Sequence, residues 1–321
     1  MVVFGRDRPR LTCPPFFTLS SQPMKDATLT RKSDPSHRSV VALTDAVAVG
    51  GDTLLVVGGP CAVESAEQME QVGHQLLQAP VQALRGGVFK PRTSPYAFQG
   101  MGEAGLRILD DLRQRFQMPV ISEVMAIDQI ELMADYVDVL QVGSRNMQNF
   151  DLLKALGRID KPVLLKRGLA ATIEEFVMAA EYILSHGNPS VILCERGIRS
   201  FDTYTRNVLD LGAVVALKQI THLPVMVDPS HAAGKRELVP ALARAAIAAG
   251  ADGIMVECHP VPEQSVSDAR QALTLEEMAN LARSLDPIAA ALGRRLGRSE
   301  ASGEGYRPEP ERVLGAIALA A

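Results

Sequence analysis

Four potential metal ligands lie at or just beyond the ends of apolar segments that are far apart in the chain. Cys61 follows LLVVGGP, Glu257 closes IMVE, and Asp268 lies in the segment beyond it, while His231 follows PVMVDPS. Residues so distant can share one ion only if the fold brings the C-terminal ends of several parallel strands together. One thiolate, one imidazole and two carboxylates suit a divalent transition metal, and Mn, Fe, Co and Zn all tolerate such a set. The sequence therefore predicts a metal site at Cys61, His231, Glu257 and Asp268.

Each of these residues also has an ordinary structural interpretation. A single cysteine is more often a small buried hydrophobe than a ligand, and a single histidine is more often structural. Asp268 could instead cap the helical segment that follows it. The metal hypothesis depends on the four occurring together. Cys194, inside an apolar segment, is expected in the core, and His259 is expected beside the ligands or facing substrate.

Cationic side chains close several of the other apolar segments. Such strand ends carry Lys90 with Arg92 and Thr93, Ser144 with Arg145, Lys166 with Arg167, and Glu195 with Arg196. One such charge is more often a salt-bridge partner, but several at the same end of a sheet would repel one another without anionic ligands. Arginine suits bidentate contacts with phosphate and carboxylate. The pattern predicts two phosphate-bearing substrates.

The elements that must position these residues are short apolar segments alternating with longer amphipathic ones, which indicates repeated βα units. Eight such segments are expected as strands, at 54–58, 87–90, 119–124, 139–143, 162–168, 191–197, 224–231 and 253–259. Helices are expected between them, for example over 172–187, where Thr172 and Glu175 have the spacing of a capping box. Another is expected over 237–250, ending on a glycine. The predicted fold is an α/β TIM (β/α)8 barrel.

The chain divides into three expected parts. Residues 1–38 mix Pro, Ser, Arg and Lys without a period and are expected to be a disordered extension, in which Met24 could be the true start. Residues 39–286 form the expected barrel, with a short hairpin at 40–49 that caps its bottom. Residues 287–321 are expected to form a C-terminal helix and a flexible tail.

Composition excludes several classes of function. The formal net charge is −4 and no long basic run occurs, so no nucleic-acid partner is expected. No apolar stretch approaches the roughly 18 residues of a membrane span without a charge or a Gly/Pro break, and no secretion-signal pattern opens the chain. Four cysteines in 321 residues fit a reducing compartment. A cytoplasmic protein with small-molecule partners and no membrane association is expected.

Several long motifs carry a family resemblance. They are GPCAVES (59–65), KPRTSPYAFQG (90–100), VGSRNMQNF (142–150), LLKRG (164–168), CERG (194–197), VDPSHAAGK (227–235) and VECHP (256–260). In these motifs, spread over about residues 40–286, the chain resembles 3-deoxy-D-arabino-heptulosonate 7-phosphate (DAHP) synthase, with the type I beta subgroup as the nearest match. The resemblance implies condensation of phosphoenolpyruvate with D-erythrose 4-phosphate, releasing phosphate, as the first step of the shikimate pathway to chorismate and aromatic amino acids. It also implies a homodimer or homotetramer.

The resemblance also implies roles for individual residues. Cys61, His231, Glu257 and Asp268 match the family's metal ligands, and Cys61, His231 and Lys90 are the expected catalytic residues. The residues matching those that bind phosphoenolpyruvate are Arg85, Lys90, Arg145, Lys166 and Arg196. Arg92 and Thr93 match those that bind the phosphate of erythrose 4-phosphate, and Ser144, where alanine is common, is expected to contact substrate. The implied mechanism polarises the aldehyde with the metal and adds water, activated near the metal or Lys90, at C2.

Two alternatives remain open at this point. 3-Deoxy-D-manno-octulosonate 8-phosphate synthase shares the barrel and phosphoenolpyruvate but takes arabinose 5-phosphate, and the KPRTS segment at 90–94 favours the shorter acceptor. An inactive barrel that serves as a scaffold for a chorismate mutase is the other alternative, and it would be expected to have lost ligands or cations, which this sequence retains. A chorismate mutase partner for an active enzyme is a further possibility. Some relatives have a feedback-regulatory module before the barrel, whereas residues 1–38 are unpatterned, so feedback control by such a module is not expected.

Overall fold

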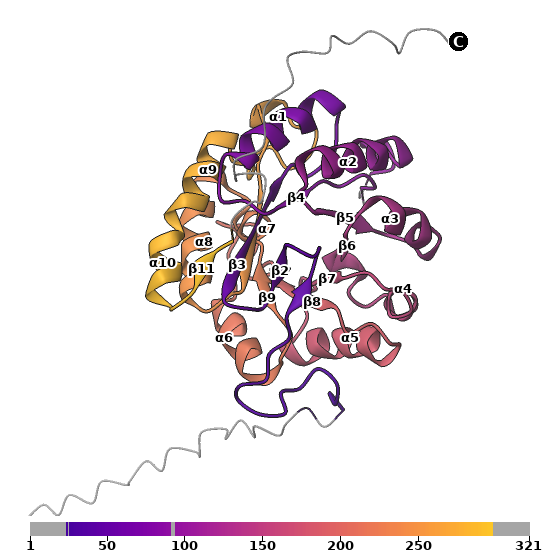
Figure 1. Cartoon of the computed structure of the whole chain (residues 1–321), viewed down its shortest axis with the longest axis vertical. Coiled ribbons are helices and arrows are strands. Elements are labelled where there is room, and N and C mark those ends of the chain that lie inside the picture. Colours follow the sequence, from indigo (N-terminus) through magenta and orange to yellow (C-terminus); the bar gives the residue numbers. More distant parts are fainter. Residues whose placement is uncertain (1–23, 25, 91–93, 298–321) are drawn as a thin grey trace, which may run out of the picture.

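A computed structural model describes residues 24, 26–90 and 94–297. Its centre is a sheet of parallel strands that curls into a closed barrel (Figure 1), and pairing of the last barrel strand with the first closes it, with Ile254 opposite Val56. The strands are β3 (Thr53–Gly59), β4 (Ala83–Arg85), β5 (Val120–Val124), β6 (Val139–Val142), β7 (Val163–Lys166), β8 (Val191–Glu195), β9 (Val225–Val227) and β10 (Gly253–Glu257). The predicted TIM barrel is confirmed.

Helices surround the strands, most of them in an outer ring (Figure 1). They are α1 (Ala66–Leu77), α2 (Glu103–Phe116), α3 (Ile130–Tyr136), α4 (Phe150–Leu156), α5 (Ile173–Ser185), α6 (Leu211–Ile220), α7 (Pro229–Ala233), α8 (Val239–Ala248), α9 (Leu275–Ser284) and α10 (Asp286–Ala291). Helix α5 begins as predicted, because Thr172 Oγ1 accepts from the Glu175 N–H at 3.1 Å while the Glu175 carboxylate accepts from the Thr172 N–H. None of the helices described is long and apolar enough to cross a membrane.

A small hairpin closes the bottom of the barrel, as predicted. Strands β1 (Val41–Ala42) and β2 (Ala48–Val49) pair antiparallel, with Val41 opposite Val49. The hairpin's apolar side chains join a core cluster with the side chains that fill the barrel interior, including Leu55, Ile121 and Leu164. Cys194 belongs to the same cluster, which confirms its predicted place in the core.

The second barrel strand lies earlier than predicted. The sequence indicated a strand at 87–90, but β4 is Ala83–Arg85 and Gly87 forms only an isolated bridge with Ala62. A Cβ on Gly87 would lie 2.7 Å from the Cys61 carbonyl oxygen, so the chain crosses close above β3 at this glycine. The apolar character of this segment instead reflects Val88, which is fully buried.

The N-terminal residues that the structure describes differ from the prediction of disorder. Glu181 of α5 accepts hydrogen bonds from the backbone N–H groups of Thr28, Leu29 and Thr30, at 2.7–3.0 Å, and from the hydroxyls of both threonines. Thr221 holds the same stretch by donating from its hydroxyl to the Thr30 carbonyl at 2.6 Å. We call residues 26–39 the N-terminal arm; it packs against α5 and the segment after α6 (Figure 1). An unpatterned sequence gave no sign of these long-range contacts, and residues 1–23 and 25 lie outside the described part.

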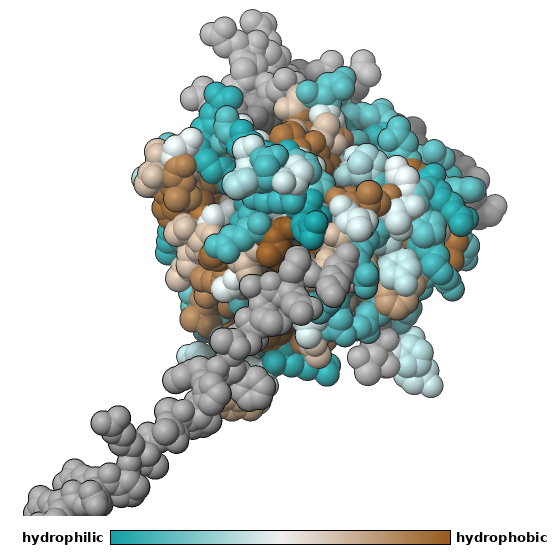
Figure 2. Space-filling model, turned by 90° about the horizontal axis from the view of Figure 1, so that it is seen from below, coloured by the Kyte–Doolittle hydropathy of each residue, from teal (hydrophilic) through white to brown (hydrophobic). Residues whose placement is uncertain are grey.

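The face of the molecule that carries the N-terminal arm has several separate apolar patches among hydrophilic residues (Figure 2).

Near the C-terminal end of the described chain, helix α10 falls in the predicted C-terminal segment. A further strand, β11 (Arg295–Leu296), follows it and pairs parallel with β3. The side chain of Gln82 supports this pairing, because it accepts from the Val56 N–H at 2.8 Å and donates to the Gly297 carbonyl at 2.6 Å. Residues 298–321, the predicted tail, lie outside the described part, and the division at residues 38 and 286 stays a prediction.

Candidate metal centre and active site

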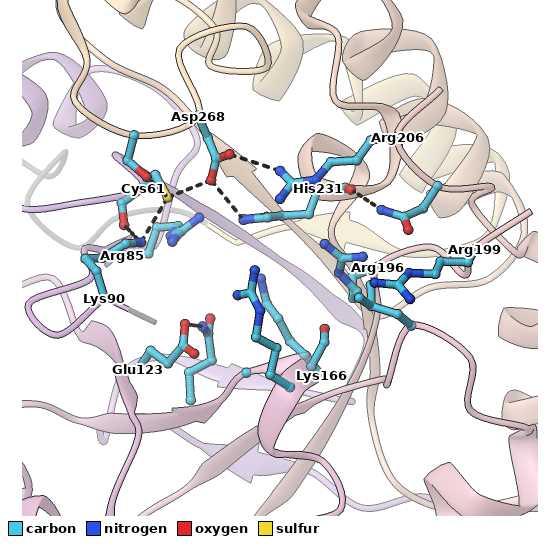
Figure 3. Close-up of a pocket in the computed structure, with 17 residues that line it drawn as sticks. Cys61, Arg85, Lys90, Glu123, Lys166, Arg196, Arg199, Arg206, His231 and Asp268 are labelled. Carbon is cyan, nitrogen blue, oxygen red and sulfur yellow. Dashed lines mark hydrogen bonds and ion pairs between the residues drawn. The ribbon is translucent and has the colours of Figure 1, made fainter. Parts of the chain in front are cut away.

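A polar cavity of about 370 Å³ opens at the C-terminal ends of the barrel strands (Figure 3). Its lining contains nine of the predicted site residues: Cys61, Arg85, Lys90, Ser144, Arg145, Lys166, Arg196, His231 and Asp268. Glu257 is fully buried beneath this cavity, next to His231. Arg92 and Thr93 lie outside the described residues.

The four predicted ligands converge at one side of this cavity. One ligand atom from each of Cys61, His231, Glu257 and Asp268 lies within 4.8 Å of the other three. His231 Nε2 is 3.3 Å from Glu257 Oε1 and 3.8 Å from Asp268 Oδ2. Zinc bonds of about 2.0–2.3 Å place two ligands no more than about 4.6 Å apart across one ion. The separation of the four ligand atoms, up to 4.8 Å, is close to that size.

His231 is oriented by Asp228, which the sequence reasoning did not select. Asp228 is the N-cap of α7; its Oδ1 accepts from the His231 N–H at 2.9 Å, and its Oδ2 accepts from Nδ1 of the ring at 2.7 Å. The bond at Nδ1 leaves Nε2 free to face the other ligands, an arrangement common for metal-binding histidines. Burial alone would raise the pKa of Asp228, but His231 and Lys166 lower it well below its usual value. The spacing of Asp and His in DPSH was the available signal.

Glu257 is held from both sides at the end of β10. Its Oε1 accepts from Arg85 Nη1 at 2.6 Å, and its Oε2 accepts from Gln271 Nε2 at 2.6 Å. Burial tends to raise the pKa of Glu257, but His231 and Arg85 outweigh it and lower the pKa. A fully buried carboxylate therefore stays anionic, which a cation ligand requires.

Asp268 is the candidate ligand whose backbone is unusual. Its φ of +56° lies in the left-handed region, which few residues other than glycine adopt. Arg206 donates to its Oδ1 at 3.0 Å, while the Cys61 thiol lies 3.1 Å from its Oδ2 (Figure 3). Burial would raise the pKa of Asp268, yet His231, Cys61 and Arg206 together lower it.

Cys61 lies among hydrogen-bond donors. Lys90 Nζ is 3.0 Å from its sulfur and 2.7 Å from its carbonyl oxygen, and Ser267 donates from Oγ to the sulfur at 3.1 Å. Burial, followed by the charge of Glu257, raises the pKa of this thiol to about 12, and Lys90 offsets only part of the rise. A thiol, an imidazole and two carboxylates that converge on one point are the sulfur, nitrogen and oxygen donors that bind divalent transition metals. These residues therefore fit a divalent cation.

The predicted cations divide into those that face the cavity and one that does not. Arg85, Lys90, Lys166 and Arg196 are each no more than 6% exposed and line the cavity, whereas Arg145 lines it from an exposed position. Lys166 forms an ion pair with the buried Asp228. Burial lowers the pKa of Arg196, and nearby acidic groups restore it only in part. Arg196 forms no ion pair with a carboxylate of the described residues, and a buried guanidinium in that position points to an anionic ligand.

Arg167 points away from the cavity. Its guanidinium pairs with Glu195 Oε2 at 2.9 Å and with Asp210 Oδ2 at 3.0 Å. Neighbouring residues at a strand end face opposite sides, so Lys166 and Arg167 cannot both point inward. From the sequence, both residues were expected at the same end of the sheet as the other cations.

Several cavity residues were missed from the sequence. They are Glu123, Gln141, Gly143, Leu169, Arg199, Arg206, Asn207 and Ser267. Glu123 and Gln141 lie within strands β5 and β6 and point inward, a position that period-two alternation could have revealed. Arg199 and Arg206 lie in the long segment after β8, where no periodic pattern exists. Their place in the cavity could be identified only from the three-dimensional structure.

The sequence profile of the DAHP synthetase I family matches residues 32–292. The chain belongs to that family. A family member named phospho-2-dehydro-3-deoxyheptonate aldolase from Thermotoga maritima is 48% identical over 255 residues, which cover 79% of this chain and 75% of the relative. A 2-dehydro-3-deoxyphosphooctonate aldolase from Syntrophotalea carbinolica is 32% identical over 259 residues, covering 75% of this chain and 92% of that one.

Solved structures agree with these sequence comparisons. The crystal structure of the Thermotoga maritima DAHP synthase has a TM-score of 0.80 at 45% identity, covering 84% of this chain and 78% of that one. A truncated form of the enzyme from the same organism has a TM-score of 0.78 at 43% identity, with 84% of this chain and 98% of that one covered. Membership in the DAHP synthetase I family is therefore supported by both sequence and fold, and it implies a divalent metal.

Proposed function

We propose that this protein is a DAHP synthase, which condenses phosphoenolpyruvate with D-erythrose 4-phosphate and water to give 3-deoxy-D-arabino-heptulosonate 7-phosphate and phosphate. The observation that carries the proposal is one cavity in which a cluster of possible metal ligands adjoins four buried cations, of which Arg196 forms no ion pair with a described carboxylate. Lost ligands or cations would have marked an inactive scaffold, and the convergence of the four proposed ligands beside Arg85, Lys90, Lys166 and Arg196 argues against one.

The buried cations are suited to phosphoenolpyruvate. Arg85, Lys90, Lys166 and Arg196 converge on one region of the cavity (Figure 3). Desolvated cations bind phosphate and carboxylate more strongly than exposed ones do, and rigid anchoring fixes the orientation of the substrate. We assign these four residues, with Arg145 and Ser144 at the rim, to the phosphate and carboxylate of phosphoenolpyruvate.

The acceptor phosphate is assigned to Arg92 and Thr93, on the family resemblance alone. Cys61, His231, Glu257 and Asp268 would hold the metal, and a bound divalent ion supplies Lewis-acid polarisation of the aldehyde oxygen. Lys90, whose ammonium group reaches both Cys61 and the cavity, is placed to move a proton between solvent and the reacting oxygen atoms. C3 of phosphoenolpyruvate bonds to the aldehyde carbon, and the aldehyde oxygen takes up a proton. Water then adds to C2, which this bond formation leaves electron-deficient, and loses a proton. The C2–O bond to phosphate finally breaks and releases inorganic phosphate.

The decisive experiment measures phosphate release from phosphoenolpyruvate by chelator-stripped protein. Erythrose 4-phosphate and arabinose 5-phosphate are compared as acceptors, before and after Mn²⁺ is returned. We expect turnover only with erythrose 4-phosphate and only after metal return. Preference for arabinose 5-phosphate would assign the octulosonate reaction instead, and full turnover without metal would refute the ligand assignment.

We further propose the finer features that the family membership leaves open. The chain is assigned to the type I beta subgroup, with Mn, Fe, Co or Zn as the ion, depending on availability. It is proposed to act in the cytoplasm as a homodimer or homotetramer, with a chorismate mutase as a partner. Size-exclusion chromatography with light scattering tests the oligomer, and co-purification with a chorismate mutase tests the partner.

A further inference from the structure

One partly buried and one buried polar residue lie close in sequence to the proposed metal ligands but do not line the cavity. Glu64 is three residues beyond Cys61, and His259 is two residues beyond Glu257. We propose that Glu64 is a positioning residue that holds the loop of residues 260–268, and with it Asp268, at the distance from Cys61 at which both bind one divalent ion. The inference rests on the proposed function in taking these two residues as ligands of the same ion.

One carboxylate oxygen of Glu64 holds the loop directly. Glu64 Oε1 accepts from Ser265 Oγ at 3.2 Å and from the Val266 N–H at 3.1 Å, across a sequence separation of about two hundred residues. The Glu64 side chain is 17% exposed, so these bonds are largely shielded from water. Glu64 therefore joins the segment that carries Cys61 to the segment that precedes Asp268.

The contact continues to the sulfur of the cluster. Ser265 Oγ lies 2.8 Å from the Ser267 carbonyl oxygen and 3.3 Å from its backbone nitrogen. Ser267 in turn donates from Oγ to Cys61 Sγ at 3.1 Å. Polar contacts thus connect Glu64 through the loop to the sulfur of Cys61, which lies three residues before Glu64 in the chain.

The other carboxylate oxygen faces His259. The His259 Nδ1 accepts from the Val261 N–H at 3.0 Å, which places the ring proton on Nε2. That Nε2 is buried and has no hydrogen-bond partner among the residues described, while Glu64 Oε2 lies 3.5 Å from it. Buried N–H groups rarely remain without an acceptor. Glu64 Oε2 faces this N–H near the beginning of the loop, while Glu64 Oε1 holds the residues nearer its end.

Asp268 needs such a brace because of its backbone conformation. A non-glycine residue at φ +56° persists only where its surroundings hold it there. The residues immediately before it are fixed by Glu64, as described above. Without that contact the loop can relax toward an unstrained backbone, and the Asp268 carboxylate then leaves the cluster.

The test is a Co²⁺ titration of the chelator-stripped protein, with thiolate-to-cobalt absorption reporting binding at Cys61. In Glu64→Ala we expect Co²⁺ affinity to fall about 10–100-fold, the range for lost partners of metal ligands. Glu64→Gln keeps an acceptor oxygen for Ser265 and Val266, so it should recover most of that affinity even if the alanine variant folds poorly. The matched control is Glu263→Ala, a carboxylate of the same loop that pairs with Arg236 at the surface, and it should bind Co²⁺ like the wild type.

The outcomes separate the two proposals. If wild-type protein gives no thiolate-to-cobalt absorption, the metal site of the proposed function is wrong. If the wild type binds and Glu64→Ala binds equally well, only the positioning role of Glu64 is refuted. Equal losses in the Glu64 and Glu263 variants would also refute it, because the loop would then be sensitive to any change.

Discussion

At the scale of single residues, chemically similar buried groups have different roles, because some face the proposed metal or substrate and others pack in the core. Cys61 and Cys194 are both buried thiols whose pKa is raised to about 12, chiefly by burial. Only Cys61 faces other ligands, since Cys194 packs in the barrel interior. Position in the fold, and not the chemistry of the thiol alone, therefore assigns the role.

Replacing these two cysteines tests that distinction. Cys61→Ser should abolish turnover and thiolate-to-cobalt absorption, because the hydroxyl is a far weaker metal ligand. Cys194→Ser places a hydroxyl in the core, so it should lower the free energy of unfolding by about 1–3 kcal/mol while Co²⁺ binding is unchanged. Substantial turnover by the Cys61 variant would remove this residue from the ligand set.

Arg196 and Arg199 provide a second matched pair, because both line the cavity but only Arg196 is buried. Arg196→Gln should weaken phosphoenolpyruvate binding more than 10-fold, since a desolvated charge-assisted bond contributes about 1.5–3 kcal/mol. Arg199→Gln should change the affinity much less, because solvent screens its charge. Calorimetry measures both, and equal losses would mean that burial is not what makes Arg196 effective.

At the scale of elements, two glycines show how the backbone sets the site. Gly59, at the end of β3, has φ +145°, and a Cβ there would lie 2.1 Å from the Arg85 carbonyl oxygen. Gly250 also has positive φ, at +98°, but a Cβ there would meet no atom within 4 Å.

Gly59→Ala should therefore cost more than about 4 kcal/mol of unfolding free energy, an exceptional value for one substitution, or prevent folding. Gly250→Ala should cost only the conformational penalty of about 1–2 kcal/mol. Urea denaturation of both variants tests this. A small effect at Gly59 would show that strands β3 and β4 can separate without loss of the barrel.

The N-terminal arm depends on one carboxylate. Burial tends to raise the pKa of Glu181, but the hydrogen bonds from Leu29, Thr30 and Thr28 outweigh it and lower the pKa. A carboxyl group whose pKa is lower in the folded state stabilises the fold above its unfolded pKa, and that contribution is lost as pH falls through the folded value. The arm should therefore be fully held at neutral pH and should loosen in acid, below the usual value of 4.5.

Amide hydrogen exchange at Thr28–Thr30 reports the state of the arm. Glu181→Gln should raise these rates at neutral pH, because its amide NH₂ group faces backbone donors and cannot replace both oxygens. Exchange in the barrel strands should stay slow. Unchanged protection of the arm in this variant would mean that Thr221 and its neighbours hold it without Glu181.

At the scale of the whole molecule, a ligand that binds only the folded barrel should stabilise all of it. A divalent ion at 100 times its dissociation constant adds about 2.7 kcal/mol to the free energy of unfolding. Mn²⁺ or Co²⁺ should therefore raise the melting temperature of stripped protein by several degrees. Cys61→Ser should not respond, and a matching rise in that variant would indicate binding elsewhere.

The sequence predicts that the four proposed ligands lie close together because they follow apolar strands, and a parallel barrel gathers such positions at one end. It misplaced the second strand because Val88 is buried outside the sheet, and apolar character alone does not distinguish the two. It missed Asp228 and Arg206, whose roles depend on which atom each contacts. The arm escaped prediction because Glu181 and Thr30 are 151 residues apart. Local sequence patterns predict whether a segment is a helix or a strand, whereas contacts between residues far apart in the chain can be identified only from the fold.

The ligand cluster spans the seam where strand β10 pairs with strand β3. Cys61 emerges early in synthesis, and Glu257 and Asp268 emerge about two hundred residues later. On the proposed ligand assignment, an ion can therefore be captured at full affinity only after the last barrel strand has joined the first. Once captured, it links the two ends of the sheet across their junction. Metal uptake would therefore indicate that strand β10 has paired with strand β3 to close the barrel. A fluorescent metal sensor could time this final step of folding.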